Sequence, residues 1–198
     1  FFEPKGRYWD KASVDVVPFA VGPDAQPALS AETLNRAVVA RPGTDATVVA
    51  YGPSVHVALK AAEAAAAEGT SLEVIDLRTV SPIDFATVVE SVRRTGRCIV
   101  VHEAPVFHGT GAEVAARVTE ECFYSLEAPV LRVGGFHTPY PVSKIEHDYL
   151  PGLDRVLDAL EHKLPRSLEH LDAAREEILA FTAFPKSIWR QIWSNNPN

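Results

Sequence analysis

The chain has 198 residues and a formal net charge of −7 at pH 7, with 46% hydrophobic and 23% charged residues. This composition is typical of a globular domain, the acidic balance argues against a nucleic-acid partner, and no segment approaches the roughly 20 apolar residues of a membrane span. Cys98 and Cys122 are too few for a disulfide framework, so we expect a reduced, cytoplasmic setting.

Residues 1–40 form the first predicted region, an irregular and proline-rich segment that we interpret as an extended connector. One short strand is predicted near residues 35–39. The chain contains no methionine and starts at Phe1. We therefore expect it to be a processed product or a piece cut from a longer reading frame.

The second predicted region, residues 41–165, alternates between short β-branched runs and helical patterns. The predicted strands cover residues 46–51, 72–77, 98–101 and 130–133. The predicted helices cover residues 54–69, 81–94, 111–126 and 153–164. Parallel strands joined by helices form right-handed crossovers, and continuous apolar runs are typical of buried parallel strands. The expected fold is therefore an α/β three-layer sandwich with a mainly parallel sheet.

Polar clusters follow each predicted strand, at residues 51–52, 76–79, 102–105 and 134–137. In open parallel sheets, ligands bind at the carboxyl ends of the strands. The pattern predicts a binding edge without identifying what binds there.

His102 and Glu103 directly follow the third predicted strand. A histidine beside a carboxylate could act as a general base or a proton relay near pH 7. We favour the alternative, a hydrogen-bonded pair that fixes a loop or an interface, because no nucleophile or phosphate-binding fingerprint accompanies the two residues. His108 adds neither the third ligand nor the regular spacing of a metal site, so no metal site is predicted. His102 and Glu103 stay weak catalytic candidates.

Two other clusters carry weaker signals. Gly109-Thr110-Gly111 precedes a predicted helix whose first N–H groups could hold an anion, but Val114 stands where a dinucleotide-binding motif has its third glycine. A tight strand-to-helix turn is the favoured interpretation. Asp76 and Arg78 are interpreted as a structural ion pair rather than as two catalytic groups.

Four motifs, in order along the chain, carry a family resemblance: VIDLRTVSPID, TGRCIVVHEAP, EECFYSLEAPVLRV and TPYP. Together they resemble the C-terminal, transketolase-like domain of β subunits of thiamine-dependent 2-oxoacid dehydrogenases, over about residues 1–164. The EECF and LEAP elements favour the branched-chain enzyme over the pyruvate enzyme. Two positions depart from the family pattern: His137 replaces an expected aspartate, and Val106-Phe107-His108 replaces a smaller, glycine-containing turn.

The resemblance implies an α₂β₂ enzyme that decarboxylates a branched-chain 2-oxoacid on thiamine diphosphate, with magnesium, and passes the acyl group to lipoyl groups. The glutamate that engages the cofactor belongs to the N-terminal domain of such subunits, so this chain alone is expected to bind no cofactor and to be inactive. Its expected partners are the α subunit, a second β subunit and the dihydrolipoyl acyltransferase core. The side chains expected to make these contacts are Phe107, His108, Phe136, His137 and Tyr140.

The third predicted region, residues 166–198, is a helical tail in which FTAFPKSIWRQIWSNNP resembles a segment of Mutator-type insertion-sequence transposases. The resemblance implies a fusion, and transposase catalysis is not expected because the chain ends before that family's acidic motif. The alternative is a native amphipathic helix whose apolar face is broken at Pro185. For the whole chain, an inactive interaction module and a gene relic also stay open as interpretations.

Overall fold

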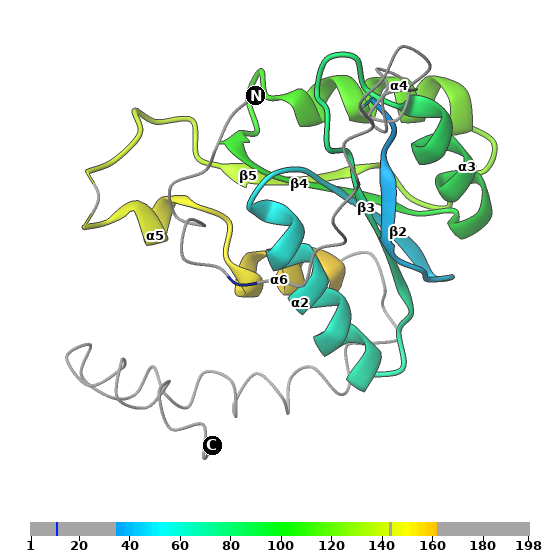
Figure 1. Ribbon diagram of the computed structural model, residues 1–198, viewed down its shortest axis with the longest axis horizontal. Coiled ribbons are helices and arrows are strands. Elements are labelled where there is room, and N and C mark those ends of the chain that lie inside the picture. Colours follow the sequence, from blue (N-terminus) through cyan, green and yellow to red (C-terminus); the bar gives the residue numbers. More distant parts are fainter. Residues whose placement is uncertain (1–10, 12–34, 143, 162–198) are drawn as a thin grey trace, which may run out of the picture.

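The computed structural model in Figure 1 describes residue 11, residues 35–142 and residues 144–161. Most of the predicted connector 1–40 and the whole predicted tail 166–198, with its helix broken at Pro185, lie outside the described residues. Among the described helices, none has the length and apolar character needed to cross a membrane.

Five strands form one sheet in the order β1-β3-β2-β4-β5. All pairs are parallel except the edge pair, in which β1 runs antiparallel to β3. The strands are β1 (Val38–Arg41), β2 (Ala46–Ala50), β3 (Leu72–Asp76), β4 (Cys98–Pro105) and β5 (Leu131–Gly135). The predicted mainly parallel sheet is therefore confirmed, and β1 partly overlaps the short strand predicted near residues 35–39.

Two helices cover each face of the sheet, as Figure 1 shows. The helices α2 (Ser54–Ala67) and α6 (Leu153–Glu161) pack on one face, and α3 (Phe85–Thr95) and α4 (Thr110–Cys122) pack on the other. Successive side chains of a strand point to opposite faces, so Val48 contributes to the core under α2 and Val49 to the core under α3. The predicted three-layer α/β sandwich is confirmed.

The helix predicted from residue 81 begins instead at Phe85. Asp84 caps it, because its Oδ1 accepts a hydrogen bond from the Thr87 N–H at 3.3 Å. Burial opposes ionisation of Asp84, but hydrogen bonds from Thr87 and from the Ala37 N–H outweigh it and lower the pKa of the carboxyl. Gly96, with φ of 71°, ends the helix in the left-handed conformation that glycine adopts easily.

The strand predicted at 98–101 is longer in the structure and extends to Pro105. Its pairing with β5 is irregular after Val101 and resumes where Pro105 faces Gly135. His102 and Glu103 therefore lie within β4, and not in the loop where the sequence placed them. A short helix that was not predicted, α5 (Glu146–Tyr149), follows β5.

A polar network closes the amino-terminal end of the sheet, and its members Thr47, Glu73 and Ser91 are buried while Arg94 is half exposed. Arg94 donates from Nη2 to Glu73 Oε1 at 2.6 Å and from Nη1 to the Gly43 carbonyl oxygen at 2.8 Å. The hydroxyl oxygen of Thr47 lies 2.6 Å from that of Ser91. Burial raises the pKa of Glu73, but hydrogen bonds from Arg94, Ser91 and Gly43 reverse the shift, so the pKa is lowered and the carboxylate is charged.

Candidate functional site

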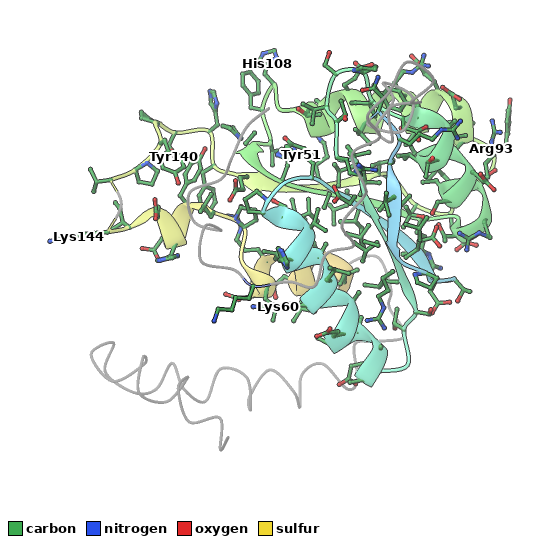
Figure 2. The ribbon with its side chains drawn as sticks, viewed as in Figure 1. Tyr51, Lys60, Arg93, His108, Tyr140 and Lys144 are labelled. Carbon is green, nitrogen blue, oxygen red and sulfur yellow. The ribbon has the colours of Figure 1, made fainter. Side chains whose placement is uncertain are left out.

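The candidate site lies at the carboxyl ends of β4 and β5, where the turn into α4 and the segment after β5 leave the sheet. Figure 2 shows His108 on that turn and Tyr140 on the segment after β5, both projecting from the sheet. We call the five predicted contact residues, Phe107, His108, Phe136, His137 and Tyr140, the aromatic edge.

His102 is completely buried at the base of this site. Its Nδ1 lies 2.8 Å from the Ala104 carbonyl oxygen, which can only accept, so Nδ1 carries the proton of the neutral ring. Nε2 then presents a lone pair, and this atom has no hydrogen-bond partner among the described residues. The ring stacks on Tyr51, with centroids 6.0 Å apart and planes 21° apart.

Three glycines make room for the His102 ring. A Cβ atom on Gly111 would lie 2.4 Å from Nε2, and Cβ atoms on Gly109 and Gly134 would lie 2.8 Å and 2.9 Å from Cε1. These distances are too short for any side chain. Gly109 and Gly111 therefore serve the packing of His102 in a strand-to-helix turn, the interpretation that the sequence favoured.

The environment keeps His102 neutral. Burial lowers the pKa of the imidazole, the hydrogen bond to Ala104 opposes that shift, and the positive charge of Arg132 lowers the pKa further. A neutral ring closed in on all sides has no access to a substrate. The geometry therefore favours the structural role of His102 over the catalytic one.

The predicted hydrogen bond between His102 and Glu103 is wrong. Neighbouring residues of a strand point to opposite faces, so His102 bonds the Ala104 carbonyl while Glu103 interacts with a different group of side chains. Burial and then the charge of Glu146 raise the pKa of Glu103. Glu146 also accepts a hydrogen bond at 3.3 Å from the hydroxyl of Tyr140, whose pKa is raised by burial and by Glu146.

The five residues of the aromatic edge are all exposed, which excludes the alternative that they are core aromatics. Phe107 is 57% exposed, and its ring centroid lies 4.2 Å from that of His108 and 4.4 Å from that of His137. Phe136 and Tyr140 are 51% and 61% exposed and pack on the buried ring of Tyr149. The structure therefore gathers the predicted contact residues into two adjoining clusters.

Two arginines that the sequence analysis did not single out support the aromatic edge. Arg132 donates to the carbonyl oxygen of Val106 at 3.0 Å. Arg155 donates to the carbonyl oxygens of Gly134 and Tyr149, and its guanidinium carbon lies 4.3 Å from the centroid of Phe136. The signal in the sequence was weak: Arg132 interrupts an apolar run, and Arg155 follows Asp154 in an amphipathic helix.

The turn between β4 and α4 contains a left-handed residue. His108 has φ of 57°, a conformation that costs a non-glycine residue roughly 1–2 kcal/mol. The family resemblance led us to expect a glycine-containing turn here. The backbone of this turn has the left-handed conformation that favours glycine, but the residue in that conformation is His108.

The remaining predicted candidates have local roles. The Arg78 N–H donates to Asp76 Oδ1 at 2.9 Å, so the side chain of Asp76 binds the backbone of the turn. Within residues 35–142 and 144–161, no group of three or more His, Cys, Asp or Glu side chains is arranged to hold a metal ion.

Curated relatives of this chain are β subunits of 2-oxoacid dehydrogenases. The pyruvate dehydrogenase E1 component subunit beta of Leifsonia xyli is 51% identical over 164 residues, which are 83% of this chain and 45% of that protein. The 3-methyl-2-oxobutanoate dehydrogenase subunit beta of Mycobacterium tuberculosis is 48% identical over 165 residues, 83% of this chain and 44% of that protein. The chain thus spans about half the length of these relatives.

A second family model, described as "Transposase, Mutator family", matches residues 133–198. Residues 133–156 of that match overlap with residues 35–156, which match the family model described as "Transketolase, C-terminal domain". Most of residues 157–198 lie outside the described residues. The finding agrees with the resemblance seen in the tail but gives no structural support for a separate tail domain.

The fold itself has a solved counterpart in a split-gene transketolase, named as an inactive β4 tetramer. That structure matches with a TM-score of 0.56 and 28% sequence identity, covering 76% of this chain and 47% of that chain. The family model described as "Transketolase, C-terminal domain" matches residues 35–156, the region that forms the sheet and nearly all of its helices. The chain therefore belongs to the transketolase C-terminal domain family.

Proposed function

We propose that this chain is the C-terminal part of the β subunit of a thiamine diphosphate-dependent 2-oxoacid dehydrogenase and that it provides subunit contacts. The carrying observation is the aromatic edge: five predicted contact residues lie exposed together at the carboxyl end of the sheet. The identities to β subunits of such enzymes support the proposal. The burial of His102 supports a structural role for it, and we place the reacting groups in another part of the enzyme.

The aromatic edge suits a protein partner for energetic reasons. Aromatic residues are enriched at protein interfaces, and burying apolar surface gains about 25 cal/mol per Å². The proposed partners are the α subunit, a second β subunit and the dihydrolipoyl acyltransferase core. The solved neighbour named as an inactive β4 tetramer supports a contact between β chains that does not itself produce activity.

We place thiamine diphosphate and its magnesium ion in a part of the enzyme outside the described residues. The glycine-rich turn before α4 is filled by the His102 ring, and the described residues offer no cluster of metal ligands. We therefore assign the described residues no contact with the cofactor and no step of the decarboxylation.

The proposed substrate class of the full enzyme is the branched-chain 2-oxoacids, with pyruvate as the alternative. The EECF and LEAP elements support the branched-chain enzyme. The relatives support both, because a pyruvate enzyme and a branched-chain enzyme match this chain at 51% and 48% identity.

The test is co-purification of the 198-residue chain with the α subunit and with the acyltransferase core, followed by turnover assays. We expect binding without turnover when thiamine diphosphate, magnesium and either 3-methyl-2-oxobutanoate or pyruvate are added. Phe107→Ala and Tyr140→Ala should weaken binding at least tenfold (about 1.4 kcal/mol each), as expected for interface anchors.

Tyr124→Ala is the matched control, because Tyr124 is fully exposed and lies after α4, outside the aromatic edge. Equal losses for Tyr124→Ala and Phe107→Ala would contradict the assignment of the contact surface. Turnover by the reconstituted mixture would contradict the claim that the chain lacks the reacting groups. Absence of binding would reject the subunit proposal altogether.

A second candidate is that the chain is a gene relic in which a dehydrogenase fragment is fused to a transposase fragment. The match of the Mutator transposase family to residues 133–198 favours it. Sequencing the DNA on both sides of the reading frame tests it. Transposase code continuing in frame after Asn198 would support the relic, whereas upstream code for a thiamine-binding domain would support a working subunit.

A further inference from the structure

We propose that His102 is an acid-sensitive latch that holds the turn between β4 and α4, and with it Phe107 and His108, in the shape seen here. This proposal rests on the proposed function in one point, namely that a partner subunit binds the aromatic edge. The latch itself is a property of this chain, and it is tested without any partner.

The surroundings of the His102 ring favour the neutral imidazole. Nδ1 donates to the Ala104 carbonyl oxygen, while Nε2 is enclosed and has no partner among the described residues. Protonation would place an N–H on Nε2, which lies so close to Gly111 in the first turn of α4 that a Cβ atom there would be 2.4 Å from it. A buried donor without an acceptor costs about 1–3 kcal/mol, and a buried charge costs more.

The groups that face the ring give no compensation for a positive charge. On β5, Arg132 already carries one, and the amino-terminal end of α4 presents the positive end of the helix dipole. Tyr51 stacks on the ring, and Glu113 in the first turn of α4 is exposed. Glu103, next along β4, interacts with Glu146 and not with His102.

Movement of the turn between β4 and α4 is the simplest way to expose a protonated His102 ring to water. The turn is held by the bond from His102 to Ala104, by the Val106 N–H donating to the Gly135 carbonyl oxygen at 3.2 Å, and by Arg132 donating to the Val106 carbonyl oxygen. His108 within it has a left-handed backbone, which favours rearrangement once these contacts weaken. Opening the turn would separate Phe107 from His137, which it now contacts at 4.4 Å.

The direction of the pH effect follows from the environment of the ring. The pKa of His102 is lowered in the folded chain, chiefly by burial, from the ordinary histidine value of 6.5. The contribution of neutral His102 is therefore fully present above pH 6.5 and is lost as the pH falls from there toward the lower folded-state pKa. The aromatic edge should be ordered at neutral pH and loosened in mild acid.

The test is hydrogen exchange of the full chain at pH 7.5 and pH 5.5, with rates corrected for the intrinsic effect of pH. In the unmodified chain, protection of the amides of residues 104–111 should fall at pH 5.5. Tenfold is about the upper limit of the loss, because one linked proton changes an equilibrium by that factor over the one pH unit below the ordinary histidine pKa of 6.5. His102→Asn keeps a side-chain N–H near the Nδ1 position but cannot titrate, so its protection of this segment should be independent of pH. His56→Asn is the control, because His56 is exposed on α2, and it should behave as the unmodified chain does.

Two results would overturn the latch. One is equal loss of protection in His102→Asn and in the unmodified chain, and the other is unchanged protection of residues 104–111 in the unmodified chain at pH 5.5. If His102→Asn does not fold, NMR titration of the unmodified chain decides. His102 should stay neutral, with its proton on Nδ1, as the pH falls through the ordinary histidine pKa of 6.5, and a His102 that becomes protonated there while the turn keeps its shape contradicts the proposal.

Discussion

The two ends of the parallel sheet are built on opposite principles. At the amino-terminal end, buried polar side chains such as Thr47 and Glu73 have partners within hydrogen-bond distance. At the carboxyl-terminal end, His102 Nε2 is buried and has no hydrogen-bond partner in the part of the chain that the structure describes, and large apolar rings such as Phe107 are exposed. The difference teaches that the polar side chains of the first end are used inside the domain, while the second end leaves apolar surface exposed, as the proposed subunit contact requires.

The largest effect is expected from Gly43→Ala at the amino-terminal end. A Cβ atom there would lie 2.2 Å from the backbone of Leu72 and Glu73, which cannot move without disrupting β3. We expect a loss of about 3 kcal/mol in the free energy of unfolding, measured by urea denaturation. Gly52→Ala is the control, since its Cβ would meet nothing within 4 Å and only its φ of 58° opposes the change. Its loss should be about 1–2 kcal/mol, and an equal or larger loss than in Gly43→Ala would contradict the close packing at Gly43.

A somewhat smaller effect is expected from Gly111→Ala at the carboxyl-terminal end, because the neighbour is a side chain rather than a backbone. The new Cβ would lie 2.4 Å from His102 Nε2, and the ring must shift. We expect a loss of about 2 kcal/mol in the free energy of unfolding. The double variant His102→Ala/Gly111→Ala should lose at least about 0.5 kcal/mol less than the sum of the single variants, since truncation of the histidine makes room for the methyl group. Additive losses would show that Gly111 is required for another reason.

Thr47→Val tests the polar network with a substitution that preserves shape. The Thr47 hydroxyl oxygen lies 2.6 Å from that of Ser91 and 2.7 Å from that of Thr95, and valine would leave both of these groups short of one partner. We expect a loss of about 1–2 kcal/mol in the free energy of unfolding, which thermal or urea denaturation would measure. Thr119→Val on the exposed surface of α4 should change stability by less than about 0.5 kcal/mol. Similar losses of unfolding free energy in Thr47→Val and Thr119→Val would mean that burial does not make the hydrogen bonds of Thr47 more stabilising than those of an exposed threonine.

The sequence predicted the fold well because the signals for it are local. The strands at residues 46–51 and 72–77 were placed to within a residue, since apolar runs are bounded by glycine and proline and by polar clusters. The end of β4 was missed because the polar residues His102 and Glu103 interrupt the apolar run, and only pairing with β5 extends the strand to Pro105. That pairing is a tertiary contact, and it leaves no local signal.

The candidate site was predicted in part for the same reason. The aromatic edge could be named in advance because exposed loop ends of parallel strands are fixed by topology. The partner of His102 could not, since the Ala104 carbonyl oxygen and the three glycines around the ring come together only in the folded chain. Arg132 and Arg155 were missed because their hydrogen-bond acceptors are backbone carbonyl oxygens, which carry no sequence signal. The Val106 and Gly134 carbonyls lie 26 and 21 positions away along the chain, and the Tyr149 carbonyl lies six positions before Arg155.

The smallest effect on stability is expected from truncating the aromatic edge, and this prediction separates the two ends of the sheet most sharply. Phe107 and Tyr140 are mostly exposed, so Phe107→Ala and Tyr140→Ala should each change the free energy of unfolding by less than about 0.5 kcal/mol in urea denaturation. The same substitutions are expected to weaken partner binding, whereas Thr47→Val should lower stability without weakening binding under conditions where the chain stays folded. A loss of stability above about 2 kcal/mol for either aromatic variant would place its ring in the core of the domain, and the carboxyl-terminal end would then be built like the amino-terminal one.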